Sequence, residues 1–211
     1  MSLKLYILQG ACSLVPHTAL VMAKHSDNIN YEIISVSREN LASPEFLVIN
    51  AQGSVPVLQD GEFSLSQNLA ILSYLDKQFP NAKIFGTGDN QKLAKTQYWL
   101  SFLNADLHKS FAPIFNPTRV VADETAYPLA IQQATTNFLN LLTIPNQQLE
   151  NQDFLNGEFT VADMYLYVIL RWATAKQVDF SQYTNIVKFI KAVEQNKVVL
   201  QALAEEDLQT L

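Results

Sequence analysis

The sequence predicts two domains, a mixed α/β domain followed by an all-helical one. Segments with strand and helix patterns alternate over the first eighty residues. Strand patterns stop after residues 81–90, where turn-forming residues cluster, and only helical spacings of apolar residues follow. We therefore expect domains at residues 1–80 and 91–211, joined by a linker at 81–90. The 211 residues, 48% of them hydrophobic, are enough for two sizeable cores.

The first domain is expected to follow the order β-α-β-α-β-β-α. Its predicted strands are 3–8, 31–36, 57–59 and 62–65, and its predicted helices are 13–24, 44–50 and 67–79. Asp60-Gly61 predicts a tight hairpin between the last two strands. A crossover helix after the first strand favours parallel pairing there, whereas the hairpin must be antiparallel. A mixed sheet of this order is typical of a thioredoxin-like domain.

The second domain is expected to contain helices alone. Apolar residues recur at helical spacing in the segments 91–115, 125–143, 160–176, 183–195 and 197–204. Thr160 and Asp163 have the spacing of a capping box, in which each side chain bonds the backbone N–H of the other residue. We expect this box to begin a core helix and to take no part in catalysis.

Composition excludes several classes of function. The net charge of −6 argues against a nucleic-acid surface, which needs a basic excess. Cys12 is the single cysteine, so an intramolecular disulfide cannot form. The opening residues lack a signal-peptide pattern, and no run approaches the ~20 apolar residues of a membrane span. His17 and His25 have no acidic or cysteine partners at ligand spacing, so no metal site is expected. We expect a soluble, cytoplasmic protein that binds neither nucleic acid nor membranes.

Cys12 is the first candidate for chemistry, because it lies between the first strand and the first helix in Gly10-Ala11-Cys12-Ser13. A thiol there faces unpaired N–H groups and the positive end of the helix dipole, which favour a thiolate. The same groups could stabilise the thiolate of a bound thiol ligand instead. The alternative is a buried cysteine that only packs.

Two polar segments could bind a ligand. Pro56 precedes the third strand and cannot donate a hydrogen bond to a sheet. A cis Val55–Pro56 bond would turn the backbone groups of Val55 outward to pair with a peptide-like ligand, and an ordinary trans proline is the alternative. Gln67-Asn68 opens the next helix, where its N–H groups and side chains suit a carboxylate. Simple helix capping is the alternative there.

The 91–115 helix carries further candidates. His108 lies off its main apolar stripe and is followed by Lys109, although a lone helical histidine is more often a surface or packing residue. Tyr98 and Phe102 also lie off the stripe, which favours a second packed face such as a subunit interface. The aromatic residues Phe111, Phe115 and Trp172 belong to the core by default, and one or two of them could line a pocket.

In their order along the chain, these segments resemble the beta class of bacterial glutathione S-transferases. The resemblance runs from Leu3 to about Leu203. The matching segments are 4–17 (KLYILQGACSLVPH), 50–58 (NAQGSVPVL), 65–75 (LSQNLAILSYL), 99–109 (WLSFLNADLHK) and 157–163 (GEFTVAD). The resemblance implies the glutathione S-transferase fold, in which a thioredoxin-like domain holds glutathione and a helical domain shapes a hydrophobic pocket.

The resemblance also implies an activity and a role for each matching position. The protein would be a homodimeric transferase of detoxification that joins glutathione, its co-substrate, to a small apolar electrophile without a tightly bound cofactor. Val55 would pair main chain to main chain with the cysteinyl part of glutathione, which favours a cis Pro56. The implied catalytic residues are Cys12, Ser13 and His108; the implied glutathione-binding residues are Ser54, Val55, Pro56, Gln67, Asn68 and Lys109; and the implied pocket residues are Phe111, Phe115 and Trp172.

The chain departs from the class at four positions. Gln52 stands where a basic residue is common, Gln67 where Glu is common, Asn68 where Ser or Gly is common, and Ser101 where Asn is common. These departures leave open a non-catalytic binding or scaffold protein with the same fold. The cysteine at position 12 leaves open thiol–disulfide exchange through a mixed disulfide with glutathione.

Overall fold

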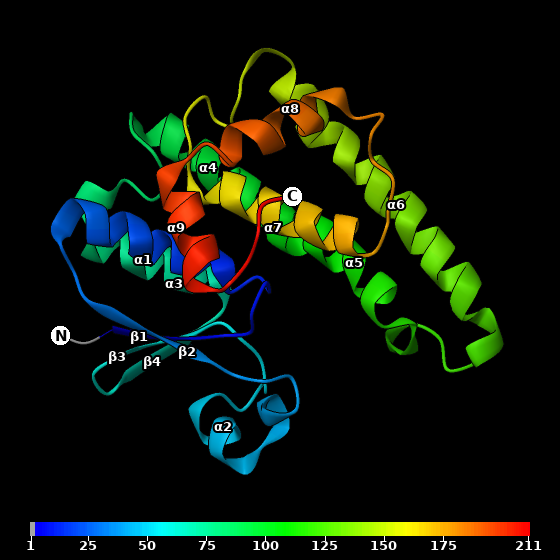
Figure 1. Cartoon of the computed structure of the whole chain (residues 1–211), viewed down its shortest axis with the longest axis horizontal. Helices are drawn as coiled ribbons and strands as arrows, with labels where there is room; N and C mark the ends of the chain where they lie inside the picture. The colour runs from blue at the N-terminus through cyan, green and yellow to red at the C-terminus, as the bar shows by residue number, and fades with distance from the viewer. Residues whose placement is uncertain (1–2) are drawn as a thin grey trace.

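A computed structural model describes residues 3–211. The strands of its first domain are β1 (Leu3–Ile7), β2 (Tyr31–Ser35), β3 (Val57–Asp60) and β4 (Phe63–Ser66). They form a four-stranded mixed sheet with the order β2-β1-β3-β4 (Figure 1). β1 is parallel to β2 and antiparallel to β3, and β3 and β4 form a hairpin. The expected strand pairing is therefore confirmed.

The helices of this domain are α1 (Leu14–Asp27), α2 (Pro44–Ile49) and α3 (Asn68–Gln78). α1 and α3 lie on one face of the sheet, and α2 lies beyond the other face (Figure 1). Leu3, Leu5 and Ile7 of β1 are buried in the main core. Tyr6 alternates with them and packs edge-on against Phe46 of α2, with 6.1 Å between ring centroids. This alternation follows from the period of two along a strand.

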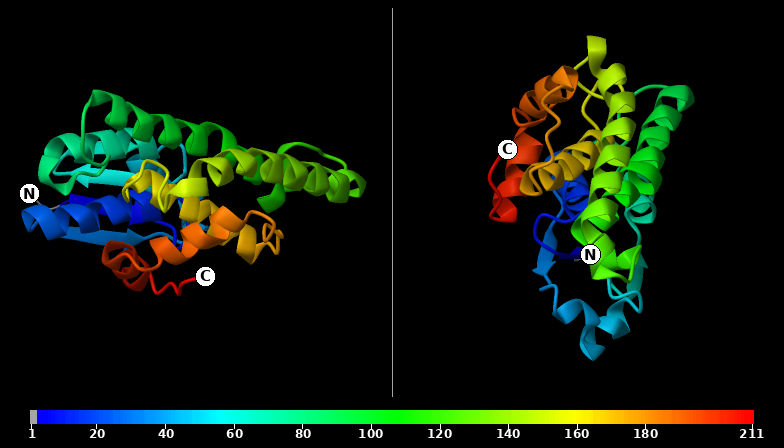
Figure 2. Two further views of the ribbon diagram at one scale, coloured as in Figure 1. Left: turned by 90° about the horizontal axis from the view of Figure 1, so that it is seen from above. Right: turned by 90° about the vertical axis from the view of Figure 1, so that its right-hand side faces the viewer.

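The second domain contains α4 (Asn90–Phe102), α5 (His108–Phe115), α6 (Tyr127–Gln148), α7 (Val161–Ala175), α8 (Thr184–Val193) and α9 (Lys197–Glu205). α7 is its central helix and is buried along most of its length, while α1 of the first domain packs against α7 and α9 (Figure 1, Figure 2). Short 3₁₀ helices lie at Asn40–Ala42, Pro80–Ala82, Pro117–Arg119, Glu124–Ala126 and Leu149–Asn151. Within residues 3–211, no helix is both long and apolar enough to cross a membrane.

One difference from the sequence prediction lies in the 91–115 helix. Residues Leu103–Leu107 form a π-helical turn between α4 and α5, in which the N–H of His108 bonds the carbonyl of Leu103. The apolar residues around it are three or four positions apart, and this spacing does not reveal a locally wider turn. Such turns occur often at functional sites. Here the turn lies directly before His108.

The segment expected to link the domains is packed rather than loose. Ile84 and Phe85 are buried, and the carbonyl of Ile84 accepts a hydrogen bond from the N–H of Val161 at the start of α7. The capping box beside it is confirmed: Asp163 accepts from the N–H of Thr160 at 2.8 Å, and Thr160 Oγ1 accepts from Ala162 N at 3.2 Å. The two domains thus share one continuous core.

Candidate functional site

Two adjoining cavities lie where the first domain meets α5 and α7. The smaller has a volume of about 280 Å³ and the larger about 550 Å³. Four residues line both cavities: Cys12, His108, Ala112 and Arg119. The smaller is also lined by Ser54, Val55, Pro56, Gln67, Asn68, Asn104, Lys109 and Tyr165, and the larger by the loop residues 8–11 with Arg38, Phe115, Asn116, Trp172 and Lys176.

Cys12 ends the loop between β1 and α1 and is half-buried at the junction of the cavities. Its Sγ lies 3.9 Å from the carbonyl oxygen of Val55. Burial raises the pKa of the Cys12 thiol to about 11, and a hydrogen bond from the Asn68 amide lowers it by less. The expected preference for a thiolate is therefore wrong for the free protein, because the cost of removing the charge from water exceeds the ~0.3–1 kcal/mol that a helix terminus typically supplies.

Ser13 does not reach the site. Its side chain is fully buried, and Oγ accepts from the N–H of Leu8 at 3.3 Å and donates to the carbonyl of Leu8 at 3.2 Å. Ser13 lines neither cavity. Ser13 precedes the first residue of α1, and its hydroxyl turns back to hold the loop that carries Cys12. The implied catalytic role of Ser13 stays a prediction, and in this structure its side chain supports Cys12 from behind.

That loop is also held from the C-terminal end of the chain. Glu206 accepts a hydrogen bond from the N–H of Gly10 at 3.0 Å, and its other carboxylate oxygen lies 2.9 Å from Nδ1 of the buried His17. Nε2 of His17 lies 2.8 Å from a carboxylate oxygen of Glu205. The indole N–H of Trp172 donates to the carbonyl of Gly10 at 2.8 Å. Side chains from three helices and the C-terminal segment thus fix the position of Cys12.

The Val55–Pro56 peptide bond is cis, so the cis interpretation is confirmed and the trans alternative is excluded. Ser54, Val55 and Pro56 line the smaller cavity together. Asn50 holds this segment by donating from Nδ2 to the carbonyl of Ser54 at 2.7 Å. The segment therefore presents its backbone beside Cys12, in the place that a peptide-like ligand would need.

Gln67 and Asn68 also line the smaller cavity. Gln67 has φ of +76° and ψ of 122°, a left-handed conformation that costs a non-glycine residue about 1–3 kcal/mol. Its side-chain amide donates to Oε1 of Gln52 at 3.0 Å, so two of the four departures from the class contact each other as an amide pair. Asn68 is only 4% exposed, and its Oδ1 has no hydrogen-bond partner among residues 3–211.

His108 joins a short chain of hydrogen bonds in the second domain. Its Nδ1 lies 2.9 Å from the hydroxyl of Tyr165, which donates to Oδ1 of Asn104 at 2.9 Å. Nδ1 must therefore carry the hydrogen, which leaves Nε2 as an acceptor. Burial, with the charges of Lys109 and Arg119, lowers the pKa of His108 to about 4. The imidazole is thus neutral at pH 7.

The three implied pocket aromatics have different positions. Phe115, 42% exposed, and Trp172 line the larger cavity, with 5.4 Å between their ring centroids. Phe111 is fully buried and lines neither cavity, because it packs between Phe138 and Trp172 at centroid distances of 5.1 and 6.2 Å. Phe111 is therefore a core residue that supports the pocket wall, not part of its surface.

Several lining residues were not among the sequence candidates: Arg38, Asn104, Asn116, Arg119, Tyr165 and Lys176. Asn104 could have been found, since it lies four residues before His108 on a helix and therefore on the same face. The other five come from four separate parts of the chain, and no local pattern marks them. Across the described residues, no group of three or more His, Cys, Asp or Glu side chains could hold a metal ion.

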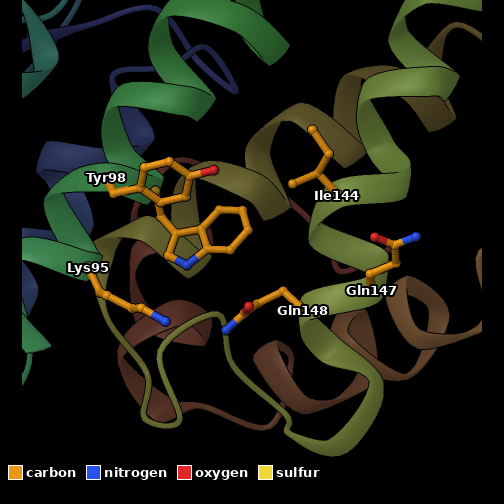
Figure 3. A pocket seen from close by; sticks show the side chains of 6 residues that line it. Lys95, Tyr98, Ile144, Gln147 and Gln148 are labelled. Atoms are coloured by element: carbon orange, nitrogen blue, oxygen red, sulfur yellow. The ribbon is translucent and has the colours of Figure 1, made fainter.

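A separate hollow of about 340 Å³ lies between α4 and α6, away from Cys12. Figure 3 shows Lys95 and Tyr98 on α4 facing Ile144, Gln147 and Gln148 on α6. Tyr98 is 55% exposed and Ile144 is 38% exposed. Phe102, by contrast, is buried against Trp99, with 5.9 Å between the ring centroids. Of the two aromatic residues expected on a second apolar face of this helix, Tyr98 alone is exposed.

Comparison with known proteins assigns both halves of the chain to one family. Residues 1–77 match the model "Glutathione S-transferase, N-terminal domain", and residues 108–197 match "Glutathione S-transferase, C-terminal domain". The glutathione S-transferase GST-4.5 of Xanthomonas campestris pv. campestris is 33% identical over 98% of this chain and 100% of its own. A glutathione S-transferase structure from Xylella fastidiosa is similar with a TM-score of 0.90, at 31% identity over 98% of this chain and 100% of that one. A beta class glutathione S-transferase from Sphingomonas chungbukensis gives a TM-score of 0.83, at 32% identity and the same coverage.

Proposed function

The chain belongs to the glutathione S-transferase family and is a glutathione transferase, and from this premise we propose that it conjugates glutathione to small electrophiles at Cys12 and His108. One observation carries the proposal: these two residues line both a small polar cavity and a larger one with an aromatic wall. A thiol held in the first would meet an electrophile held in the second. A sphingomonad glutathione S-transferase that is 31% identical has been solved with glutathione bound.

Glutathione would occupy the smaller cavity. Its cysteinyl main chain would pair with Val55, its γ-glutamyl end would reach Gln67 and Asn68, and Ser54, Pro56 and Lys109 would complete the wall. The unpartnered Oδ1 of Asn68 supports this placement, because a buried acceptor without a donor is costly and the ammonium of the γ-glutamyl group supplies one.

The chemical step requires the glutathione thiolate, which is a minor form at neutral pH because a free thiol has a pKa of ~8.5. The thiol of Cys12, which stays protonated, would donate a hydrogen bond to that sulfur. Nε2 of the neutral His108 would accept a hydrogen bond from the thiol, while the proton itself passes to solvent because a His108 pKa of about 4 makes the imidazole too weak a base to take it. The nearby Lys109 and Arg119 would stabilise the negative charge on the sulfur. The sulfur electron pair then forms a C–S bond with the electrophile as its leaving group departs with the other pair.

The wild-type protein tests this function directly. We expect retention on immobilised glutathione and conjugation of glutathione to a chlorodinitrobenzene. Retention without any conjugation would contradict the proposed chemistry. The absence of both retention and conjugation would favour the non-catalytic scaffold instead.

Thiol–disulfide exchange through Cys12 is the second candidate function, because Cys12 alone among the described residues is a thiol and it lines both cavities. The raised pKa of Cys12 opposes it, because at pH 7 the thiol form predominates over the thiolate that attacks a disulfide. Exchange would therefore be slow at neutral pH and would accelerate as the pH rises toward the raised pKa.

Replacing Cys12 with alanine separates the two functions. The mixed disulfide formed with glutathione disulfide, measured by intact mass, should disappear in Cys12→Ala, and glutathione-dependent disulfide reduction should fall sharply. Conjugation of the chlorodinitrobenzene should persist at a substantial level, because it needs donors to the thiolate rather than a covalent bond to Cys12. Complete loss of conjugation with unchanged glutathione affinity would contradict this division of roles.

The proposal includes a cytoplasmic role in detoxification and a homodimer. The exposed apolar side chains Tyr98 and Ile144, on neighbouring helices, support an isologous interface over the hollow in Figure 3. Sedimentation at micromolar concentration should give about twice the chain mass of 23.7 kDa, and Tyr98→Lys should shift the protein toward the monomer. A wild-type species at the chain mass would contradict the homodimer.

A further inference from the structure

Three side chains of the second domain form a chain of hydrogen bonds beside the smaller cavity. Asn104 belongs to the π-helical turn, His108 begins α5, and Tyr165 lies in the first half of α7. The hydroxyl of Tyr165 lies 2.9 Å from Oδ1 of Asn104 and 2.9 Å from Nδ1 of His108. All three residues line the cavity in which glutathione would bind. The proposed conjugation gives a role to His108 and leaves Asn104 and Tyr165 without one.

One hydrogen bond sets the direction of this chain. The hydroxyl of Tyr165 has a single hydrogen, and it donates that hydrogen to Oδ1 of Asn104. Its oxygen can therefore only accept from Nδ1 of His108, so Nδ1 carries the ring hydrogen and Nε2 has a free electron pair. Asn104 thus determines, through Tyr165, which nitrogen of His108 is an acceptor.

The surroundings of Tyr165 keep its hydroxyl neutral and in place. The side chain is fully buried. Burial raises the pKa of Tyr165, the neighbouring Cys12 raises it further, and a hydrogen bond from the Asn68 amide lowers it by less. The hydroxyl therefore keeps its hydrogen at neutral pH. The imidazole of His108 is held on its other side by packing edge-on against Trp172, with 4.7 Å between the ring centroids.

We propose that Tyr165 and Asn104 are positioning residues that hold His108 with its hydrogen on Nδ1, so that Nε2 meets the glutathione sulfur as an acceptor. The inference rests on the proposed function for the identity of the ligand. Glutathione would then be bound as the thiol, with its S–H directed at Nε2. A hydrogen bond to the neutral form of a group disfavours its ionisation, so stabilisation of the thiolate would come from Lys109 and Arg119 rather than from His108.

Nitrogen NMR spectroscopy of the free protein tests the position of the hydrogen, because protonated and unprotonated ring nitrogens have well-separated chemical shifts. The chain has 3 histidines, and the variant His108→Gln identifies the signals of His108. The pKa of about 4 keeps this ring neutral at pH 7, so the two neutral tautomers are compared directly. We expect the hydrogen on Nδ1 in wild type. In Tyr165→Phe the Nδ1 hydrogen would have no acceptor, and we expect a large share of the molecules to carry it on Nε2.

Variants of Asn104 test what sets the direction. Asn104→Asp keeps an acceptor, and a carboxylate at pH 7 can only accept, so Nδ1 of His108 should stay protonated. Asn104→Leu removes the acceptor; the Tyr165 hydroxyl should then donate to Nδ1, and the ring hydrogen should move to Nε2. Tyr183→Phe is the matched control, because Tyr183 is also buried and donates to the carbonyl of Leu139 at 2.6 Å, outside both cavities. This control should keep the wild-type tautomer.

The ionisation of bound glutathione, followed by the absorbance of its thiolate as the pH is raised, gives a second readout. In Tyr165→Phe and Asn104→Leu the thiol should ionise about one pH unit lower than in wild type, because an N–H at Nε2 can donate to the thiolate. Asn104→Asp and the control variant should not show this decrease. The other titratable groups that line the smaller cavity, Cys12, Lys109 and Arg119, are the same in all these variants.

The two readouts separate this inference from the proposed function. A hydrogen on Nε2 of His108 in wild type would overturn the inference, and so would one common tautomer in wild type, Tyr165→Phe and Asn104→Leu. Equal ionisation of bound glutathione in all the variants would also overturn it, because Nε2 would then not contact the sulfur. If glutathione does not bind at all, the proposed function fails, whereas the expected set of tautomers in the free protein would still support the positioning of His108.

Discussion

Replacing Asp163 with alanine is expected to lower the free energy of unfolding by about 3–5 kcal/mol. The Asp163 carboxylate is fully buried and accepts three hydrogen bonds: from the N–H of Leu155 at 2.7 Å, from the N–H of Thr160 at 2.8 Å and from the hydroxyl of Thr160 at 3.1 Å. Alanine would leave two buried N–H groups without an acceptor, and each such group costs about 1–3 kcal/mol. Urea denaturation at about pH 4, where this difference is expected to be largest, measures the change directly.

The matched control is Asp179→Ala, because Asp179 is exposed and accepts a local hydrogen bond from the N–H of Ser181 at 2.9 Å. We expect this substitution to cost less than about 1 kcal/mol. Folded Asp163→Ala protein should keep the wild-type Michaelis constant for glutathione, since Asp163 lines neither cavity. Wild-type stability combined with lost glutathione affinity would identify Asp163 as a ligand contact and contradict the structural role.

The contribution of Asp163 should also depend on pH. Burial raises its pKa to about 7, and the three hydrogen bonds lower it by less. A carboxyl group whose pKa is raised in the folded state stabilises that state most below its ordinary value of about 4, and this contribution is lost as the pH rises through the folded-state value. The stability difference between wild type and Asp163→Ala should therefore shrink between about pH 4 and pH 7.

Replacing Asn68 with alanine is expected to raise the Michaelis constant for glutathione about 10- to 100-fold. Oδ1 of Asn68 is buried and unpartnered within residues 3–211, in the wall of the smaller cavity, and a hydrogen bond to a charged ligand group contributes about 1.5–3 kcal/mol. The Michaelis constant for the electrophile should change little, because Asn68 does not line the larger cavity. Steady-state kinetics with each substrate varied in turn measures both constants.

Asn90→Ala is the control, since Asn90 is likewise the first residue of a helix but is exposed and lies outside both cavities. Both variants should fold, as judged by thermal melting. The melting temperature of Asn68→Ala should stay close to that of wild type, because removal of the unpartnered Oδ1 offsets the loss of the amide hydrogen bond to Cys12. An unchanged Michaelis constant for glutathione in Asn68→Ala would show that this acceptor does not bind the substrate.

The sequence by itself determined the features that depend on neighbouring residues. Strand alternation, helical spacing and the Asp60-Gly61 turn predicted the order of elements in the sheet, and Thr160 and Asp163 predicted the start of α7. The same local chemistry did not reveal the π-helical turn at Leu103–Leu107, because four-residue apolar spacing fits either kind of turn. The signals that end a helix are also local, but they did not give the end of α6 correctly. We expected this helix to end at residue 143, and α6 extends five residues further, to Gln148.

The tertiary structure alone decided which candidates reach the site and in which charge state. Cys12 has a raised pKa because side chains from other elements exclude water from it, an effect that a helix terminus cannot offset. Ser13 and Phe111 are turned into the core, while Arg38, Arg119 and Lys176 converge on one cavity from positions far apart in the chain. The burial of a group and the electrostatic potential at that group depend on all the atoms around it in space. A pattern of residues that are neighbours in the sequence does not include most of those atoms.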